Sequence, residues 1–463
     1  MTLIKSISGI RGTIGGRPEI NLTPVDTVKF AAAYGSYMQS QSKEAKLTIV
    51  IGRDARISGE MIQSLVMQTL VGMGIDIIDL GLSTTPTVEM AVVDKKAQGG
   101  IILTASHNPK QWNALKLLDA QGEFLDAAAG TKILFLAENE DFNFAEVDDL
   151  GQIIQDKTAI DQHIKAVLAH PLIDLPAIKA AGFSAVVDGV NSTGGIAIPA
   201  LLDALGVNCF PLYCDPTGYF PHNPEPLKEH LGDLAQKVVE KKADLGIVVD
   251  PDVDRLAFMD ESGEMFGEEY TLVACADYVL SKTPGNTVSN LSSTRALRDV
   301  TEAAGGQYFA SAVGEVNVVA KMKEKQAVIG GEGNGGIIDP NLHYGRDALV
   351  GIALFLSLLA QRMCSVSALK ASYPQYYMSK GKIALDESLD VDALLRKMED
   401  KYRNDQPLTI DGVKIDFPTG WVHMRKSNTE PIIRVYAEAN SQEEAEELTQ
   451  RFSAELLAIS KCL

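Results

Sequence analysis

One arrangement of elements recurs three times along this chain: an apolar strand, a helix that ends on glycine, and a second strand. The copies place these elements at 47–51, 58–72 and 75–80, at 185–188, 192–205 and 206–210, and at 288–291, 293–304 and 305–309. Strands that alternate with helices are typical of mostly parallel sheets covered on both faces, and glycine suits a helix C-terminus. We therefore predict three related α/β domains, built on mixed, mostly parallel sheets between helices.

The C-terminal part of the chain has a different pattern, which predicts a small α+β domain. It indicates a helix at 389–402, a hairpin of strands 408–410 and 413–417, strands at 421–424 and 432–437, and a last helix that begins at Ser441 with a capping box. A chain of 463 residues holds three or four domains of about 100–200 residues each. We predict domains at 1–152, 153–256, 257–370 and 371–463.

Composition and charge argue against several kinds of protein. The formal net charge of −19 disfavours a general nucleic-acid surface, because phosphate backbones require clustered Lys and Arg. No apolar run reaches the ~18 residues of a membrane span, and the N-terminus lacks the features of a signal peptide. Five scattered cysteines form no metal-spaced pair and indicate reduced thiols. We expect a cytoplasmic protein that binds neither nucleic acid nor a membrane.

The most specific chemical signal is the acidic segment Asp250-Pro-Asp-Val-Asp-Arg255, directly after an apolar strand at 245–249. Alternate residues of extended chain point the same way, so Asp250, Asp252 and Asp254 can converge on one hard cation. Three close carboxylates without a cation would repel one another. The segment therefore predicts a Mg²⁺ site with coordination positions left open for a phosphate oxygen.

Two other interpretations of this acidic segment stay possible. In an EF-hand, Glu261 would occupy loop position 12, but Arg255 stands where that loop requires glycine, and a strand rather than a helix precedes it. A simple acidic turn at a strand end would need no metal at all.

A second signal is the stretch from Gly99 to Pro109, where a buried strand at 101–103 opens into a turn that presents Ser106. Pro109 cannot continue a strand ladder and holds the preceding residue out of helix. A turn with a capping serine would look the same. A serine hydrolase is disfavoured, because G-x-S-x-G is absent and Ser106 and His107, as neighbours on extended chain, tend to point apart.

Three further segments offer groups that suit a phosphorylated sugar. The glycine-rich loop 330–336 carries Glu332 and Asn334, a carboxylate and an amide that suit sugar hydroxyls, although a plain flexible loop is equally compatible. The segment 425–431 offers a guanidinium, an ammonium and hydroxyls for a phosphate, or is a charged hairpin loop. Arg11 lies between glycines, which predicts an irregular loop, with a plain hairpin as the alternative.

Cations also stand beside other strand ends and glycine-rich segments, namely Arg53, Arg56, Lys116, Arg255 and Arg346. An acidic protein that places its cations at such loops is suited to hold an anion. A serine, a three-carboxylate metal site and a phosphate cradle together indicate phosphoryl transfer, in which Ser106 carries the phosphoryl group covalently.

These motifs resemble, over the full length and in the same order, those of the α-D-phosphohexomutase superfamily. They are S-G-I-R-G at 8–12, T-A-S-H-N-P at 104–109, D-P-D-V-D-R at 250–255, G-E-G-N-G-G at 331–336 and R-K-S-N-T-E-P at 425–431. The resemblance implies four domains, three α/β and one smaller α+β. It also implies that Ser106 is the phosphoserine and that Mg²⁺ is held by a phosphoserine oxygen with Asp250, Asp252 and Asp254.

The resemblance implies roles for the remaining candidates as well. Arg11 and Lys116 line the reacting centre, His107 lies next to the serine, and Arg255 faces the substrate. Glu332 and Asn334 contact the sugar hydroxyls. The non-reacting phosphate is bound by Arg425, Ser427, Asn428 and Thr429. This chain departs from the family at two places. The family often has N-G-I-K where Asn113-Ala-Leu-Lys116 stands here, which implies a slightly stiffer loop, and G-E-x-S-G-H where this chain has Asn334 and Gly336, which leaves the identity of the substrate open.

The implied reaction moves phosphate between O6 and O1 of a hexose through a 1,6-bisphosphate, which also serves as activator. The form of the glycine-rich loop, with Val313-Gly-Glu-Val316 upstream, looks most like an archaeal-type phosphoglucosamine mutase. The resemblance thus favours glucosamine 6-phosphate as substrate, with a phosphoglucomutase/phosphomannomutase as the alternative. A Mg²⁺-dependent sugar phosphatase and a non-catalytic Ca²⁺-binding protein are more remote alternatives. The sequence is compatible with a monomer or a homodimer.

Overall fold

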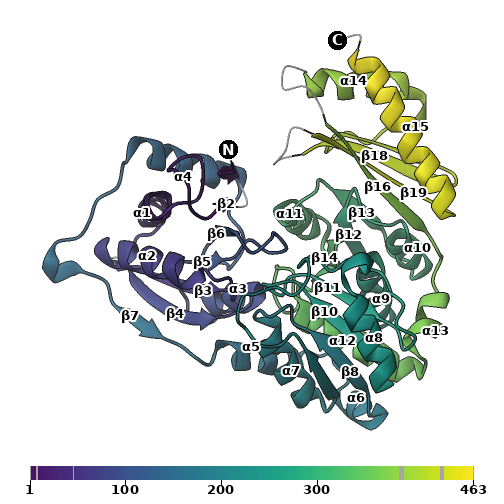
Figure 1. Ribbon diagram of the computed structural model, residues 1–463, viewed down its shortest axis with the longest axis horizontal. Coiled ribbons are helices and arrows are strands. Elements are labelled where there is room, and N and C mark those ends of the chain that lie inside the picture. Colours follow the sequence, from purple (N-terminus) through teal and green to yellow (C-terminus); the bar gives the residue numbers. More distant parts are fainter. Residues whose placement is uncertain (1, 7–8, 45, 385–389, 428–431, 462–463) are drawn as a thin grey trace.

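The computed structural model describes residues 2–6, 9–44, 46–384, 390–427 and 432–461. Four sheets follow one another along the chain, and Figure 1 shows the first at one side, the second and third packed together, and the fourth at the far end of the third. The prediction of three α/β units and a C-terminal α+β unit is confirmed.

The first sheet has seven strands in the order β1-β2-β6-β5-β3-β4-β7. Its strands β3, β4, β5 and β7 are parallel, whereas β6, β2 and β1 continue the sheet antiparallel. The strands are Ile4–Ser6, Gly9–Thr13, Thr48–Arg53, Asp76–Leu82, Gly99–Leu103, Trp112–Leu118 and Ile153–Gln155 for β1 to β7, with helices α1 (Pro24–Gln41), α2 (Gly59–Gly72), α3 (Thr85–Asp94) and α4 (Ala127–Asn139).

The second and third sheets repeat the central part of the first. The second has β8 (Ser184–Asp188), β9 (Asn208–Leu212), β10 (Leu245–Val249) and β11 (Leu256–Met259), and the third has β12 (Asn286–Asn290), β13 (Tyr308–Ser311), β14 (Ala327–Glu332) and β15 (Gly336–Ile338). The orders β11-β10-β8-β9 and β15-β14-β12-β13 match β6-β5-β3-β4. In all three, a parallel triplet ends in one antiparallel strand.

Helices cover these two sheets and join them to their neighbours. They are α5 (Ala159–Ala169), α6 (Leu175–Ala181), α7 (Gly194–Leu205), α8 (Gly232–Lys241), α9 (Glu268–Lys282), α10 (Ala296–Ala303), α11 (Glu315–Lys325), α12 (Ala348–Arg362) and α13 (Val366–Ala371). The expected glycines follow the helix of each repeat: Gly74, Gly206 and Gly305 all have positive φ, between 74° and 82°, a conformation in which glycine costs least.

Two strands lie at the domain limits drawn from the sequence. β7 begins at residue 153, just past the limit at 152, and pairs with β4 of the first sheet. β11 spans residues 256–259, across the limit at 256, and pairs with β10 of the second sheet. Arg11, expected on an irregular loop, lies instead in β2, in a hairpin with β1. Gly9 allows that strand to approach β6 closely, since a Cβ there would lie 2.2 Å from the carbonyl oxygen of Leu115.

The fourth sheet is antiparallel, in the order β16-β19-β18-β17. Its elements are β16 (Tyr377–Ala384), α14 (Val391–Lys401), β17 (Val413–Phe417), β18 (Gly420–Lys426), β19 (Ile432–Ala439) and α15 (Gln442–Ser460), which Ser441 caps as expected. The predicted strand at 408–410 is wrong: Leu408 makes one isolated bridge to Lys414, and β17 pairs with β18. Leu408 and Ile410 are 44% and 55% exposed, so they bury little apolar surface that would hold a strand.

The second and third sheets share one hydrophobic core, whereas the first and fourth units have cores of their own. Phe258 of β11 stacks on Phe355 of α12 with ring centroids 3.8 Å apart, and both side chains are fully buried. The units built on these two sheets therefore form one body. None of the described helices is long and apolar enough to cross a membrane.

Truncation of Phe355 to alanine is expected to lower the free energy of unfolding by about 3–5 kcal/mol, because it empties the shared core between the second and third sheets. Urea unfolding followed by far-UV circular dichroism measures this loss. Phe135→Ala is the matched control, since that ring is 61% exposed on α4 and should change stability little. An equal loss in both variants would contradict a shared core at Phe355.

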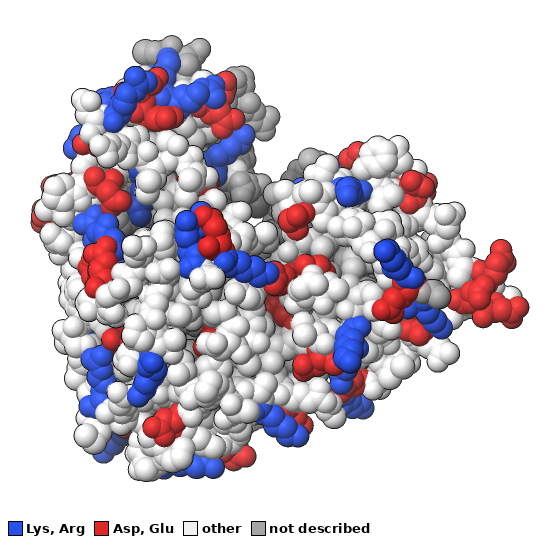
Figure 2. Space-filling view, turned by 180° about the vertical axis from the view of Figure 1, so that it is seen from behind, with Lys and Arg blue, Asp and Glu red and all other residues white. Residues whose placement is uncertain are grey.

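Figure 2 shows the face opposite to that of Figure 1, where acidic and basic side chains are interspersed. The surface is hollowed between the lobe that holds the first sheet and the lobe that holds the fourth. The serine, aspartate and glycine-rich loops come from the first three sheets, whereas the candidate phosphate-binding segment begins at the end of β18 of the fourth.

Candidate active site

Three of the predicted motifs occupy the same place in the three repeated sheets. Each lies in the connection from the third parallel strand to the antiparallel strand: β5 to β6 carries Ser106, β10 to β11 carries the aspartates, and β14 to β15 follows Glu332. Ligands of open α/β sheets bind outside the carboxyl ends of such strands. The repeated topology thus presents three different chemical loops from equivalent positions, and side-chain contacts join them.

Ser106 is held in an unusual backbone conformation beside the acidic loop. Its φ is +48°, a region that costs energy for residues other than glycine and is enriched at functional sites. The Ser106 backbone N–H donates to the Thr104 hydroxyl at 2.9 Å, and the Ser106 hydroxyl donates to Asp250 Oδ2 at 2.6 Å. The side chain of the serine is therefore aimed at the first of the three aspartates.

The three aspartates form a buried cluster that fits a divalent cation. Asp250, Asp252 and Asp254 are fully buried, and one carboxylate oxygen of each lies within 4.8 Å of the others. Oδ1 of Asp252 and Oδ1 of Asp254 are buried without a hydrogen-bond partner among the described residues, which is costly unless a cation takes them. Burial and the two neighbouring carboxylates raise the pKa of Asp250. All-oxygen, anionic donors of this kind suit Mg²⁺.

Three cations surround the serine and the aspartates. Lys116 Nζ donates to Asp252 Oδ2 at 2.7 Å and to Asp254 Oδ2 at 3.2 Å, and these carboxylates raise its pKa although burial opposes them. Arg255 Nε lies 4.0 Å from Asp250 and Asp254. Burial and the charge of Arg255 lower the pKa of Arg11. This concentration of positive charge beside a hydroxyl is suited to a phosphate dianion.

His107 is nearer to the serine hydroxyl than the sequence suggested. Its Nδ1 lies 3.5 Å from Ser106 Oγ, because the left-handed conformation of Ser106 replaces the extended one in which neighbouring side chains diverge. Burial and the charges of Arg255 and Arg11 lower the pKa of His107 well below its usual value. The imidazole is therefore neutral and has a nitrogen lone pair available.

The glycine-rich loop joins the same cluster through Glu332. Glu332 Oε1 accepts from Asn290 at 2.8 Å and from the Gly314 N–H at 3.1 Å, and Oε2 accepts from Arg346 Nη1 at 3.1 Å. Arg346 also reaches Asp254 at 2.8 Å. Asn334, by contrast, bonds within its own loop, where its Oδ1 accepts from the Gly336 N–H at 3.3 Å.

The candidate phosphate-binding segment lies in the fourth domain, apart from this cluster. Arg425 is in β18, and its Nε is buried without a hydrogen-bond partner in the part of the chain that the structure describes. The Ser427 N–H donates to the Ile432 carbonyl at 3.0 Å, directly after β18. Asn428 and Thr429 lie outside the described residues.

Two of the cations noted from the sequence hold the protein together instead of facing an open site. Arg56 is almost fully buried, and its guanidinium donates to Asp54 and to the carbonyls of residues 106, 108, 109 and 112. Arg56 thus fixes the backbone of the serine loop. Arg53 donates to Gln63 and to the Asp54 carbonyl. The opposite charges two residues apart after β3 are the signal that could have indicated this structural role.

Thr85, at the start of α3, is a site residue that sequence reasoning missed. Its N–H donates to the Asp252 carbonyl at 2.8 Å, and its hydroxyl donates to Asp252 Oδ2 at 2.7 Å. It thereby orients one candidate metal ligand across a domain boundary. A Thr-Thr-Pro run at a helix start indicates a cap, but nothing in it points to the aspartate loop.

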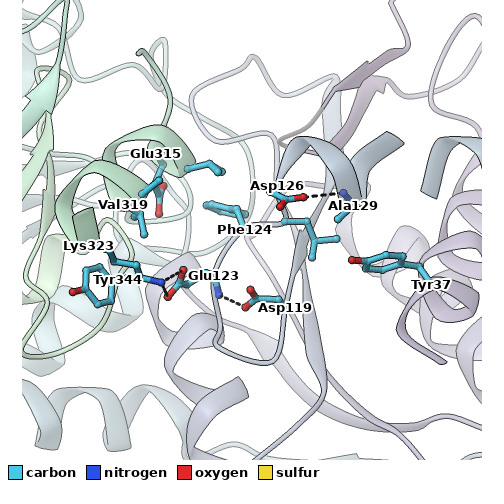
Figure 3. A pocket seen from close by; sticks show the side chains of 13 residues that line it. Tyr37, Asp119, Glu123, Phe124, Asp126, Ala129, Glu315, Val319, Lys323 and Tyr344 are labelled. Atoms are coloured by element: carbon cyan, nitrogen blue, oxygen red, sulfur yellow. Dashed lines mark hydrogen bonds and ion pairs between the residues drawn. The ribbon is translucent and has the colours of Figure 1, made fainter. Parts of the chain in front are cut away.

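A cavity of about 320 Å³ lies between the first and third domains. Figure 3 shows Lys323 reaching Glu123 across it, with Asp119, Asp126 and Tyr37 on the opposite side from Glu315 and Val319. The ring of Phe124, which lines it, lies 5.5 Å from Lys116 Nζ. None of the candidate catalytic, metal or substrate residues lines this cavity, so it is separate from the reacting centre.

Comparison with known proteins assigns the whole chain to one family. Sequence models of the phosphoglucomutase/phosphomannomutase family match α/β/α domains I, II and III at residues 3–144, 161–263 and 267–377, and the C-terminal domain at 382–455. A phosphoglucomutase/phosphomannomutase of Thermococcus kodakarensis is 35% identical over 443 residues, 94% of this chain and 96% of that protein.

Two further relatives agree. A probable phosphoglucosamine mutase of Methanopyrus kandleri is 32% identical over 449 residues, 96% of this chain and 96% of that protein. The crystal structure of a phosphoglucomutase/phosphomannomutase family protein from Burkholderia thailandensis matches with a TM-score of 0.85 at 26% identity and covers 100% of this chain and 98% of that one. The resemblance read from the motifs is confirmed: the chain belongs to the phosphoglucomutase/phosphomannomutase family of phosphohexomutases, which are isomerases.

Proposed function

We propose that this phosphohexomutase moves phosphate between O6 and O1 of glucosamine phosphate, with Ser106 as the phosphoryl carrier. The observation that carries the proposal is the Ser106 hydroxyl, 2.6 Å from Asp250 in a buried carboxylate triad and surrounded by Lys116, Arg11 and Arg255. A hydroxyl in this setting is arranged for covalent phosphoryl transfer and not for acyl transfer.

In the first half of the cycle, a substrate hydroxyl attacks the phosphorus on Ser106. The new O–P bond forms as the Ser106 Oγ–P bond breaks. We assign the proton transfer to neutral His107, which takes the proton of the attacking hydroxyl and returns it to the leaving Ser106 Oγ, 3.5 Å from its Nδ1. Lys116 and Arg11 balance the charge of the transferring group. Mg²⁺ held by the aspartate triad supplies further charge neutralisation when it is bound. The second half reverses these steps on the other phosphate.

The remaining candidates hold the sugar and its second phosphate. We assign the sugar hydroxyls to Glu332, Asn334 and Arg255, and the non-reacting phosphate to Arg425 and Ser427 with Asn428 and Thr429. The orphaned Nε of Arg425 supports that assignment, because a buried guanidinium donor without a partner suits an anion. A hexose 1,6-bisphosphate would activate the enzyme by phosphorylating Ser106. The four described cysteines are unpaired, which suits a reducing, cytoplasmic setting.

The choice of glucosamine rests on the form of the glycine-rich loop and on relatives named phosphoglucosamine mutase. The relative named phosphoglucomutase/phosphomannomutase supports the alternative substrates, glucose and mannose phosphates. Glucosamine phosphate differs from glucose and mannose phosphates at C2, where it carries an amine instead of a hydroxyl.

A side-by-side assay decides between these substrates. Purified protein with Mg²⁺ and catalytic 1,6-bisphosphate is given the 6-phosphates of glucosamine, glucose and mannose, and the formation of each 1-phosphate is followed by ³¹P NMR. We expect kcat/KM for glucosamine 6-phosphate to be highest by about tenfold or more, since a site that pairs with the cationic C2 ammonium loses a charge-assisted hydrogen bond when a neutral C2 hydroxyl replaces it. A higher kcat/KM for glucose or mannose would assign the alternative activity, and phosphate release without isomerisation would assign a phosphatase.

A further inference from the structure

We propose that Arg346 is a positioning residue that ties the sugar-binding loop to the metal loop, an inference that rests on the function proposed above. Its guanidinium joins Glu332, the candidate sugar carboxylate, to Asp254, the third carboxylate of the candidate metal site. Through Arg346, the sugar would be held at a fixed place relative to the serine and the metal.

The contacts of Arg346 use each guanidinium nitrogen in a different direction. Nη1 donates to Glu332 Oε2 at 3.1 Å, Nη2 donates to Asp254 Oδ2 at 2.8 Å, and Nε donates to Glu315 Oε2 at 2.8 Å. The backbone N–H of Arg346 also donates to Glu315 Oε1 at 3.2 Å. Only the planar fork of arginine can serve three carboxylates in this way, whereas a lysine is a point charge.

The three carboxylates belong to three separate segments, which gives the contact its consequence. Asp254 comes from the loop after β10, Glu315 begins α11, and Glu332 ends β14. All three side chains are buried, as is Arg346 at 7% exposure. Each carboxylate would carry a large penalty if the guanidinium were removed, because a buried charge needs a partner. Arg346 therefore fixes the relative position of the metal and sugar loops.

Gly336 supplies an independent indication that the place of Arg346 is built into the loop. A Cβ at Gly336 would lie 2.3 Å from Arg346 Cδ and 2.9 Å from Cγ. The backbone of Gly336 does not have the positive φ that would by itself require glycine. Glycine is needed at position 336 because the aliphatic part of the Arg346 side chain occupies the space that a Cβ would take. The three carboxylates hold the guanidinium at the end of that side chain.

Arg346 itself is set by the helix that follows. Asp347 caps α12, where its side chain accepts from the N–H groups of Leu349 and Val350. The Asp347 N–H also donates to the Ile337 carbonyl of β15 at 2.8 Å, which holds the backbone next to Arg346 beside that strand.

Two variants test the proposal by different routes. Arg346→Lys keeps the charge but loses the fork, and Gly336→Ala keeps the arginine but displaces it. We expect each variant to raise KM for the preferred hexose phosphate by about tenfold or more, because each loses a charged hydrogen bond to Glu332. The half-saturating Mg²⁺ concentration should change by less than about threefold. Arg362→Lys is the matched control, because that arginine pairs with Asp277 at the exposed end of α12 and should leave both constants unchanged.

Glu332→Gln, alone and with Arg346→Lys, shows whether the arginine acts through the sugar carboxylate. If it does, the double variant raises KM no more than the larger single effect, because the two residues act as one unit. Multiplicative losses, or variants with lowered melting temperature and unchanged KM, would overturn the proposal. Titration calorimetry of hexose phosphate with each variant reads binding without turnover. A wild-type protein that binds but isomerises no hexose phosphate would instead count against the proposed function.

Discussion

Replacement of Ser106 by alanine is expected to lower the interconversion of hexose phosphates by roughly 10⁴-fold or more, as for removal of other catalytic nucleophiles. The hydroxyl that donates to Asp250 is the group assigned to carry the phosphate, and alanine leaves no oxygen for the covalent step. Intact-protein mass spectrometry should show part of the wild-type protein heavier by one phosphate and the variant entirely without it. The mutase assay measures the rate on the same samples.

The control for this prediction is Ser64→Ala, which removes an exposed hydroxyl from α2 in the same domain. It should retain both the rate and the mass shift. Urea unfolding of the Ser106 variant separates loss of chemistry from loss of structure, because the small hydroxyl contributes little to the core. A Ser106 variant that isomerises at the normal rate would exclude the covalent mechanism.

The fold could be predicted where a local pattern carries it. The strands β3, β8 and β12, and the helices and glycines that follow them, repeat along the chain, so three α/β units could be predicted from the sequence. The antiparallel strands of these α/β units could not be predicted in the same way. β15 has only three residues and its first is a glycine of the preceding loop, while β2 reads as a glycine-rich loop. Both become strands because neighbouring strands offer them hydrogen bonds, which no local pattern shows.

In the candidate site, too, a local pattern predicts the roles of some residues and not those of others. The aspartates stand two residues apart, and the sequence predicts their convergence from the alternation of an extended chain. They do converge, but the backbone that brings them together is a turn at 251–253, where Val253 has a φ of +66°. The roles of Arg56 and Arg346 depend on partners far away in the sequence: Arg56 holds the serine loop about 50 residues away, and Arg346 reaches Asp254 across 92 residues. The sequence predicts a cation that could bind an anion at both positions, because only the packing of the folded chain decides whether a charged group faces a ligand or another part of the protein.

The proximity of Ser106 and His107 shows how one dihedral angle changes an inference. On extended chain these side chains tend to diverge, and that expectation disfavours a serine–histidine contact. A positive φ at Ser106 brings the ring nitrogen to 3.5 Å from the hydroxyl. Small residues around a proline made a turn predictable, whereas the left-handed conformation depends on Thr104 and Arg56, which bond the backbone of the serine.

The second large effect is expected for Asp252→Asn, which should abolish Mg²⁺ binding and reduce activity by roughly 10³-fold or more, as for loss of an electrostatic group at the reacting centre. Asp252 Oδ2 is shared by Lys116 and Thr85, and Oδ1 is buried without a partner. The amide removes one of three negative charges and offers the metal a neutral oxygen. Thermal unfolding with and without MgCl₂ measures the binding, since a ligand at about 100 times its Kd stabilises the native state by about 2.7 kcal/mol.

We expect wild-type protein and the control Asp203→Asn, which alters an exposed carboxylate on α7, to melt at a higher temperature with MgCl₂. The Asp252 variant should melt at the same temperature with and without the salt, because the remaining carboxylates of Asp250 and Asp254 cannot hold the ion alone. A full Mg²⁺ shift in that variant would place the metal elsewhere. Three carboxylates in a buried cluster leave too few ligands for the six to eight oxygens that Ca²⁺ takes, so we expect a smaller shift with Ca²⁺ than with Mg²⁺ in the wild type. A larger shift with Ca²⁺ would favour the calcium-binding alternative.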